Sequence, residues 1–92
     1  MKRILLALVI GIGLFACAGV PVQEMSDARQ ALQAAAEVGA REKATEAYQS
    51  ANELLGKAEG ALKTANYAEA RELAEQAKEQ AIQARKQSLG SR

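Results

Sequence analysis

The chain has 92 residues, a formal net charge of +1, one cysteine and no histidine. This near-neutral charge gives no electrostatic basis for nucleic-acid binding. Without histidine, the usual nucleophile–base pairs and Cys/His metal sites are missing. We therefore expect no enzymatic activity, no cofactor and no metal site.

The first sixteen residues have the layout of a cleaved export signal. Two basic residues come near the start, an uncharged apolar stretch runs from Ile4 to Leu14, and the small residue Ala16 follows. This order of a basic, an apolar and a small-residue region is typical of secretory signal peptides. We therefore expect residues 1–16 to be removed from the mature protein.

The signal closes with the sequence Leu14-Phe15-Ala16-Cys17. These residues resemble the lipobox of bacterial lipoproteins, in which the cysteine receives a diacylglyceryl group and becomes the first residue after cleavage. Leu14 and Ala16 match that motif, whereas Phe15 is bulkier than the residue usual at its position. The resemblance implies that Cys17 is lipidated and anchors the mature protein to a membrane.

Two alternatives compete with lipidation. An uncleaved membrane helix needs about 20 apolar residues, but the run from Ile4 to Val20 is shorter, contains glycines and meets Pro21. An ordinary signal peptide with an incidental cysteine would leave an exported protein with an unpaired thiol. Lipidation would account for this unpaired thiol. Two or three acyl chains would also attach the protein stably to a membrane, whereas one chain anchors only weakly.

Residues 17–25 are predicted to form an extended tether, because they include Gly19 and Pro21 and show no helical periodicity. At ~3.3 Å per residue the tether would reach about 25–30 Å.

Ser26 suits an N-cap, which predicts a first helix over residues 26–38, ended by Gly39. One side of this helix carries its apolar residues. They are Ala28, Ala31, Leu32, Ala35 and Val38.

A second helix is predicted over residues 41–64, because apolar residues recur there at alternating steps of three and four. The stripe comprises Ala44, Ala47, Ala51, Leu54, Ala58, Ala61 and Ala65. Tyr48, Leu55 and Leu62 recur every seven residues beside it and are available to the first helix. Gly56 and Gly60 lie inside this predicted helix, where glycine is unfavourable. We interpret them as positions where another helix approaches closely, rather than as glycines that the helix merely tolerates.

Residues 64–67 interrupt the pattern, and Asn66 tolerates a left-handed conformation, so a tight turn is predicted there. A third helix over residues 67–88 carries a second alanine stripe, flanked by Leu73 and Ile82. The stripe comprises Ala70, Ala74, Ala77, Ala81 and Ala84. Two seams of small residues would let their helices approach closely. The expected fold is all-α, a small antiparallel bundle over residues 26–88 with a C-terminal tail over 89–92.

The segment around the turn resembles a single tetratricopeptide repeat. The resemblance covers residues 51–84 through Asn66-Tyr67-Ala68-Glu69-Ala70 but lacks the closing proline. At least about three such repeats are needed for a solenoid. Together with the lipobox and the first helix ending in Val38-Gly39-Ala40, this hairpin resembles the small bacterial lipoproteins grouped as domain of unknown function 4398. That resemblance implies fold and location only.

The thin core predicts association with a partner, since little apolar surface can be buried within one copy. We expect a homo-oligomer or an envelope protein partner, with Tyr48, Leu55 and Leu62 at the contact. Ala18 stands where an aspartate would retain enteric lipoproteins at the inner membrane. The lipoprotein resemblance therefore implies the outer membrane, facing the periplasm, or the outer leaflet of the plasma membrane in a single-membrane organism.

The expected role is that of a structural or adaptor module in the bacterial envelope. One alternative is a tether like the major murein lipoprotein, which ends in a lysine used for covalent attachment. This chain ends in Arg92, whose guanidinium cannot make the same amide link. The other alternative is non-covalent binding of peptidoglycan or a hydrophobic ligand in a groove between the first helix and the hairpin.

Overall fold

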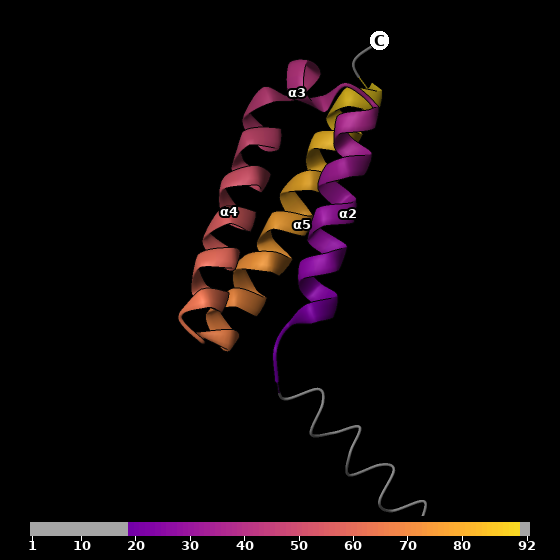
Figure 1. Cartoon of the computed structure of the whole chain (residues 1–92). Helices are drawn as coiled ribbons and strands as arrows, with labels where there is room; N and C mark the ends of the chain where they lie inside the picture. The colour runs from indigo at the N-terminus through magenta and orange to yellow at the C-terminus, as the bar shows by residue number, and fades with distance from the viewer. Residues whose placement is uncertain (1–18, 91–92) are drawn as a thin grey trace, which may run out of the picture.

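Helices account for almost all of residues 19–90, the part of the chain that the computed structural model describes. They are α2 (Val22–Glu37), α3 (Ala40–Lys43), α4 (Thr45–Lys63) and α5 (Tyr67–Gly90), and no strand occurs within this range. α4 runs antiparallel to both α2 and α5 (Figure 1). The predicted all-α bundle is therefore confirmed.

α5 is the helix on which the others pack. It contacts both α4 and α2, which share fewer contacts with each other (Figure 1). Its buried face is the predicted alanine stripe, in which no residue is more than 1% exposed: Ala70, Ala74, Ala77, Ala81 and Ala84. Alanine loses no rotamer freedom when it is buried, and its methyl group lets neighbouring helices approach closely.

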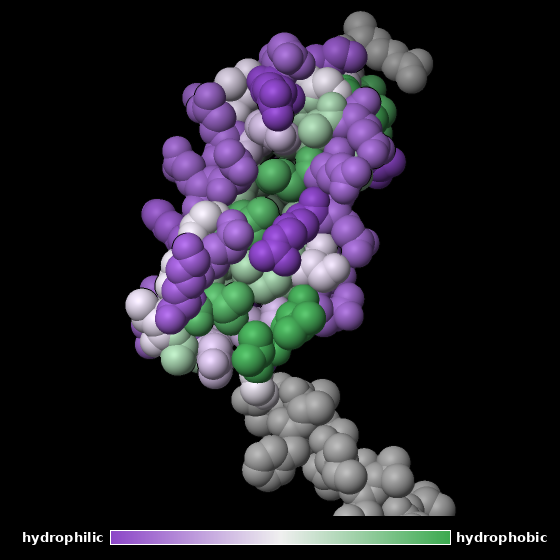
Figure 2. All heavy atoms as spheres, in the orientation of Figure 1, coloured by the Kyte–Doolittle hydropathy of each residue, from purple (hydrophilic) through white to green (hydrophobic). Residues whose placement is uncertain are grey.

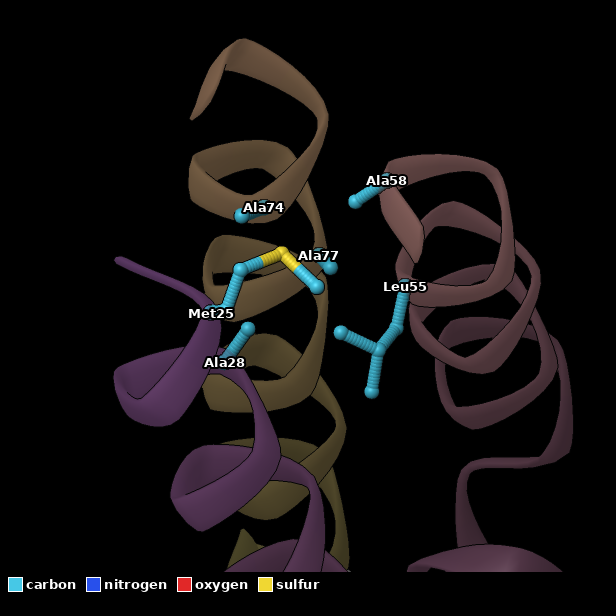
Figure 3. Packing of buried hydrophobic residues seen from close by; sticks show 6 residues of the cluster. All are labelled: Met25, Ala28, Leu55, Ala58, Ala74 and Ala77. Atoms are coloured by element: carbon cyan, nitrogen blue, oxygen red, sulfur yellow. The ribbon is translucent and has the colours of Figure 1, made fainter. Parts of the chain in front are cut away.

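The core consists of two clusters that share the half-buried Leu32. Met25 of α2 and Leu55 of α4 are the large side chains of the first cluster, beside the alanines of α5 (Figure 3). Tyr48 is the large side chain of the second, which also contains Ala40 of α3. α2 therefore covers the flank of α4 that carries Tyr48 and Leu55.

α2 begins earlier than predicted. Its first residue is Val22, so Ser26 lies within the helix, and the predicted tether over residues 17–25 is wrong in its second half. Met25 is 2% exposed and reaches the core from the first turn of the helix. Its backbone N–H donates to the carbonyl of Pro21 at 3.0 Å, and the φ of −78° at Pro21 is compatible with a helix start.

The predicted second helix is divided in two at Ala44. Gly39 has a φ of +80°, as its predicted role as a helix stop requires, and the single turn α3 follows it. At Ala44 the backbone leaves the helical region before α4 begins. The hydroxyl of Thr45 donates to the carbonyls of Arg41 and Glu42, at 3.1 and 3.2 Å, which satisfies acceptors that the break leaves without helical partners.

The turn between α4 and α5 lies where it was predicted, but its left-handed residue is Ala65, with a φ of 60°, and not Asn66. The backbone N–H of Asn66 donates to the carbonyl of Ala61, and that of Ala65 to the carbonyl of Leu62. This pair of bonds is a Schellman motif. The carbonyl of Asn66 accepts the N–H of Ala70, so Asn66 opens α5 instead.

Three further details differ from the sequence predictions. Gly56 and Gly60 do not mark a close approach, because a Cβ built at either position meets nothing within 4 Å. α5 continues to Gly90, so part of the predicted C-terminal tail is helical. Ile82, predicted to flank the seam, is exposed instead.

These backbone conformations predict opposite effects of exchanging glycine and alanine. Gly39→Ala should destabilise the bundle by about 1 kcal/mol, and Ala65→Gly should stabilise it by about 1 kcal/mol, because only glycine adopts a left-handed conformation without strain. Gly56→Ala should also stabilise it, by roughly 0.5–1 kcal/mol, because the glycine is helical and the space around it is open. Urea denaturation of a soluble chain that starts at Gly19 measures all three, and a stabilising Gly39→Ala would contradict the assignment.

Candidate functional site

The junction between the N-terminal segment and the bundle is fixed by Arg71 of α5. Its Nε donates to the carboxylate of Glu24 in α2 at 3.0 Å, and its Nη2 donates to the backbone carbonyl of Gly19 at 3.1 Å. The Arg71 and Glu24 side chains are 32% and 29% exposed, which makes this ion pair only partly accessible to water. One guanidinium therefore holds two points of the N-terminal segment against α5.

This arrangement fixes where the N-terminal segment leaves the bundle. The helix starts of α2 and α5 lie at the same end of the molecule as the α4–α5 turn (Figure 1). We call this end the anchor end, defined by Gly19–Val22 and the turn at residues 64–67. α3 and the end of α5 lie at the opposite end, which we call the distal end. α5 has 24 residues, which at 1.5 Å each separates the two ends by about 36 Å.

Neither Arg71 nor Glu24 was predicted as a site residue. They are separated by 47 positions, and Glu24 was placed in the extended tether. A single arginine on the surface of a charged helix carries no pattern that would identify its partner. The pairing depends on α2 lying parallel to α5, which no local sequence signal specifies.

The predicted lipidation site lies outside the described residues. Cys17 and the lipobox residues Leu14, Phe15 and Ala16 precede Gly19, the first residue that the structure describes. Lipidation therefore stays a prediction. Between residues 19 and 90, no helix combines the length and the apolar composition that a bilayer span requires.

The three residues predicted to contact a partner are mostly turned inward. Tyr48 and Leu55 are 9% and 8% exposed and pack in the core, while Leu62 is half-buried. Arg41 covers the outer side of Tyr48. Its guanidinium carbon lies 5.6 Å from the ring centroid, and its Nη2 donates to the tyrosine hydroxyl at 3.3 Å. This hydrogen bond raises the pKa of Arg41, whose guanidinium is charged at neutral pH in any environment.

Two surface hollows flank α5. One, of about 410 Å³, lies between α2 and α5, where a groove was predicted. Its lining consists of Glu24, Asp27, Glu75, Lys78, Glu79 and Ile82. The other, of about 490 Å³, lies between α4 and α5 near the turn and includes Lys57, Asn66 and Leu73. Among the described residues, no group of carboxylates is arranged to hold a metal ion.

The family of the chain follows from a comparison with family models. Residues 23–90 match the model described as domain of unknown function, DUF4398. The chain belongs to this family. The match runs through α2, α3, α4 and α5, so the DUF4398 domain here is the whole described bundle. No match was found among curated proteins or among solved structures.

Loss of Arg71 should loosen the start of α2 without unfolding the DUF4398 bundle. We expect Arg71→Gln to speed hydrogen–deuterium exchange of the Met25 amide and its neighbours. The free energy of unfolding should fall by no more than about 1 kcal/mol, the usual range for accessible ion pairs. Arg85→Gln, at an exposed position on the same helix, serves as the control. Unchanged exchange at the start of α2 in Arg71→Gln would contradict the assigned role.

Proposed function

We propose that this DUF4398 protein is a lipoprotein of the bacterial outer membrane, anchored through acylated Cys17 and facing the periplasm. Its helical bundle acts as a structural or adaptor module. The observation that carries the proposal is the pair of hydrogen bonds from Arg71. One bond fixes Gly19, only two positions after Cys17, to one end of the bundle, and the other fixes Glu24 of α2 there. An anchor at Cys17 would therefore orient the whole bundle with its distal end away from the lipid.

The distal end is suited to contact another envelope component. α3 presents three exposed charged residues in succession, Arg41, Glu42 and Lys43, on a turn fixed by Gly39. The long α5 places this turn about 36 Å from the anchor end. A rigid bundle anchored at one end and charged at the other is suited to hold a partner at a set distance from the membrane.

Binding of peptidoglycan or another ligand is the second candidate, and the hollow between α2 and α5 favours it. Four carboxylates and one lysine line this hollow, together with Ile82. Such a lining attracts an amine-bearing ligand and repels an anionic one. A homo-oligomer is the other form that the adaptor can take, with a second copy as the partner.

The anchor is tested by metabolic labelling with a fatty acid. The native protein should incorporate label and fractionate with the outer membrane, while Cys17→Ser should incorporate none. Lys86→Ser, a substitution at an exposed position of α5, should label like the native protein. Label on Cys17→Ser, or its absence from the native protein, would refute the anchor.

The adaptor role is tested by photo-crosslinking in intact cells. A photoreactive residue at Glu42, on the distal end, should capture one envelope protein or a second copy of the chain. The same residue at Glu69, an exposed position on the first turn of α5, should not. Recovery of muropeptides instead would favour the ligand-binding alternative, and identical products from both positions would contradict a distal contact.

A further inference from the structure

Apolar side chains are exposed at the anchor end of the bundle. Val20 is 44% exposed, Val22 68% and Tyr67 38%. Val22 and Tyr67 are the first residues of α2 and α5, and Val20 lies two residues before α2. Tyr67 lies one helical turn before Arg71, whose guanidinium contacts the Gly19 carbonyl next to Val20. The three side chains therefore belong to one end of the molecule. Hydrophobic residues gather at the lower end of the face in Figure 2.

These residues take no part in the two core clusters. α2 already buries Met25 and Ala28 against α5, and the exposed valines lie before that contact. A tyrosine with a partly exposed ring is suited to the boundary between water and lipid, where one end of the side chain is apolar and the other is wet. The three exposed side chains of this end therefore fit a lipid surface.

The short stretch of chain between Cys17 and Gly19 makes the membrane the surface that lies closest to the anchor end. This step rests on the proposed acylation of Cys17. Two residues span at most about 7 Å when fully extended, so Gly19 lies within that distance of the Cys17 Cα. While Arg71 holds the Gly19 carbonyl on the bundle, the tether between the anchor end and the lipid is limited to these two residues. The nearest carboxylate in α2 is that of Glu24. Because it is paired with Arg71, it opposes the approach of the anchor end to the lipid less than an unpaired carboxylate would.

We propose that the anchor end is a second membrane contact, in which Val20, Val22 and Tyr67 rest in the headgroup region of the bilayer. The acyl chains supply the attachment, and these side chains set the orientation. α2 and α5 then stand with their first turns on the lipid and their distal ends in the periplasm. The contact is too small to bind a membrane by itself, and it acts only on a chain that is already attached.

Tryptophan fluorescence tests this contact, because the chain contains no tryptophan. Tyr67→Trp places the probe at the anchor end, and Leu89→Trp places a matched probe at the distal end of the same helix. The native side chains are 38% and 44% exposed, and the two positions lie about 33 Å apart along α5. Each variant is reconstituted in vesicles whose phospholipids carry bromine near the top of the acyl chains.

The attachment is made in two ways, so that failure of the contact and failure of the anchor are distinguishable. One preparation uses the protein purified from bacterial membranes. The other couples residues 17–92 to maleimide-bearing lipid through the Cys17 thiol, and therefore does not depend on lipidation in the cell. Fatty-acid labelling decides the anchor, and the coupled chain decides the contact.

We expect brominated lipid to quench Tyr67→Trp at least twofold and to leave Leu89→Trp unchanged. Val22→Asp, added to Tyr67→Trp, should remove most of this quenching without changing the helical circular dichroism spectrum, because Val22 is exposed. Equal quenching at both ends of the coupled chain would overturn the proposal. So would a Tyr67→Trp probe that is shielded from acrylamide but not quenched by bromine, because a protein surface would then cover this end.

Discussion

The bundle depends on helices that meet through single methyl groups. The buried face of α5 is a row of alanines, and both neighbouring helices pack against it. Side chains this small contribute little burial individually, so the helices must lie close together for backbone and methyl contacts to accumulate. Ala74 and Ala77 share a cluster with residues of both α2 and α4, so a larger side chain at either position would separate two helices at once.

A smooth alanine surface specifies the register of a neighbouring helix only weakly. The few large side chains fix this register instead. Met25 and Leu55 extend toward each other from α2 and α4 (Figure 3), and Tyr48 fills the second cluster near α3. Arg71 adds a directional constraint at the anchor end, whereas the more exposed Arg29–Glu59 pair, at 3.7 Å, contributes little to stability.

Periodicity predicted the helices and the faces that they bury, because apolar spacing follows directly from helical geometry. It did not predict their ends. α2 begins before Ser26 because burial of Met25 outweighs a favourable capping residue, and Ala65 takes the left-handed position because Asn66 opens α5. The partner surface was predicted from Tyr48 and Leu55, but the chain covers both with its own α2. The Arg71 contacts join distant segments, and periodicity says nothing about such pairs.

The position of α5 also determines when the bundle can close as the chain emerges from the ribosome or from a membrane translocon. α2 is the first of these helices to emerge, and its principal partner, α5, is the last. α4 and α5 are separated by only a short turn, so their contacts are local in sequence and form rapidly once both are available. α2 must wait for that hairpin, with Met25 and Ala28 lacking their partners on α5. A nascent chain interrupted before α5 therefore has no bundle to join, and its exposed apolar surface makes it a target for chaperones and proteases.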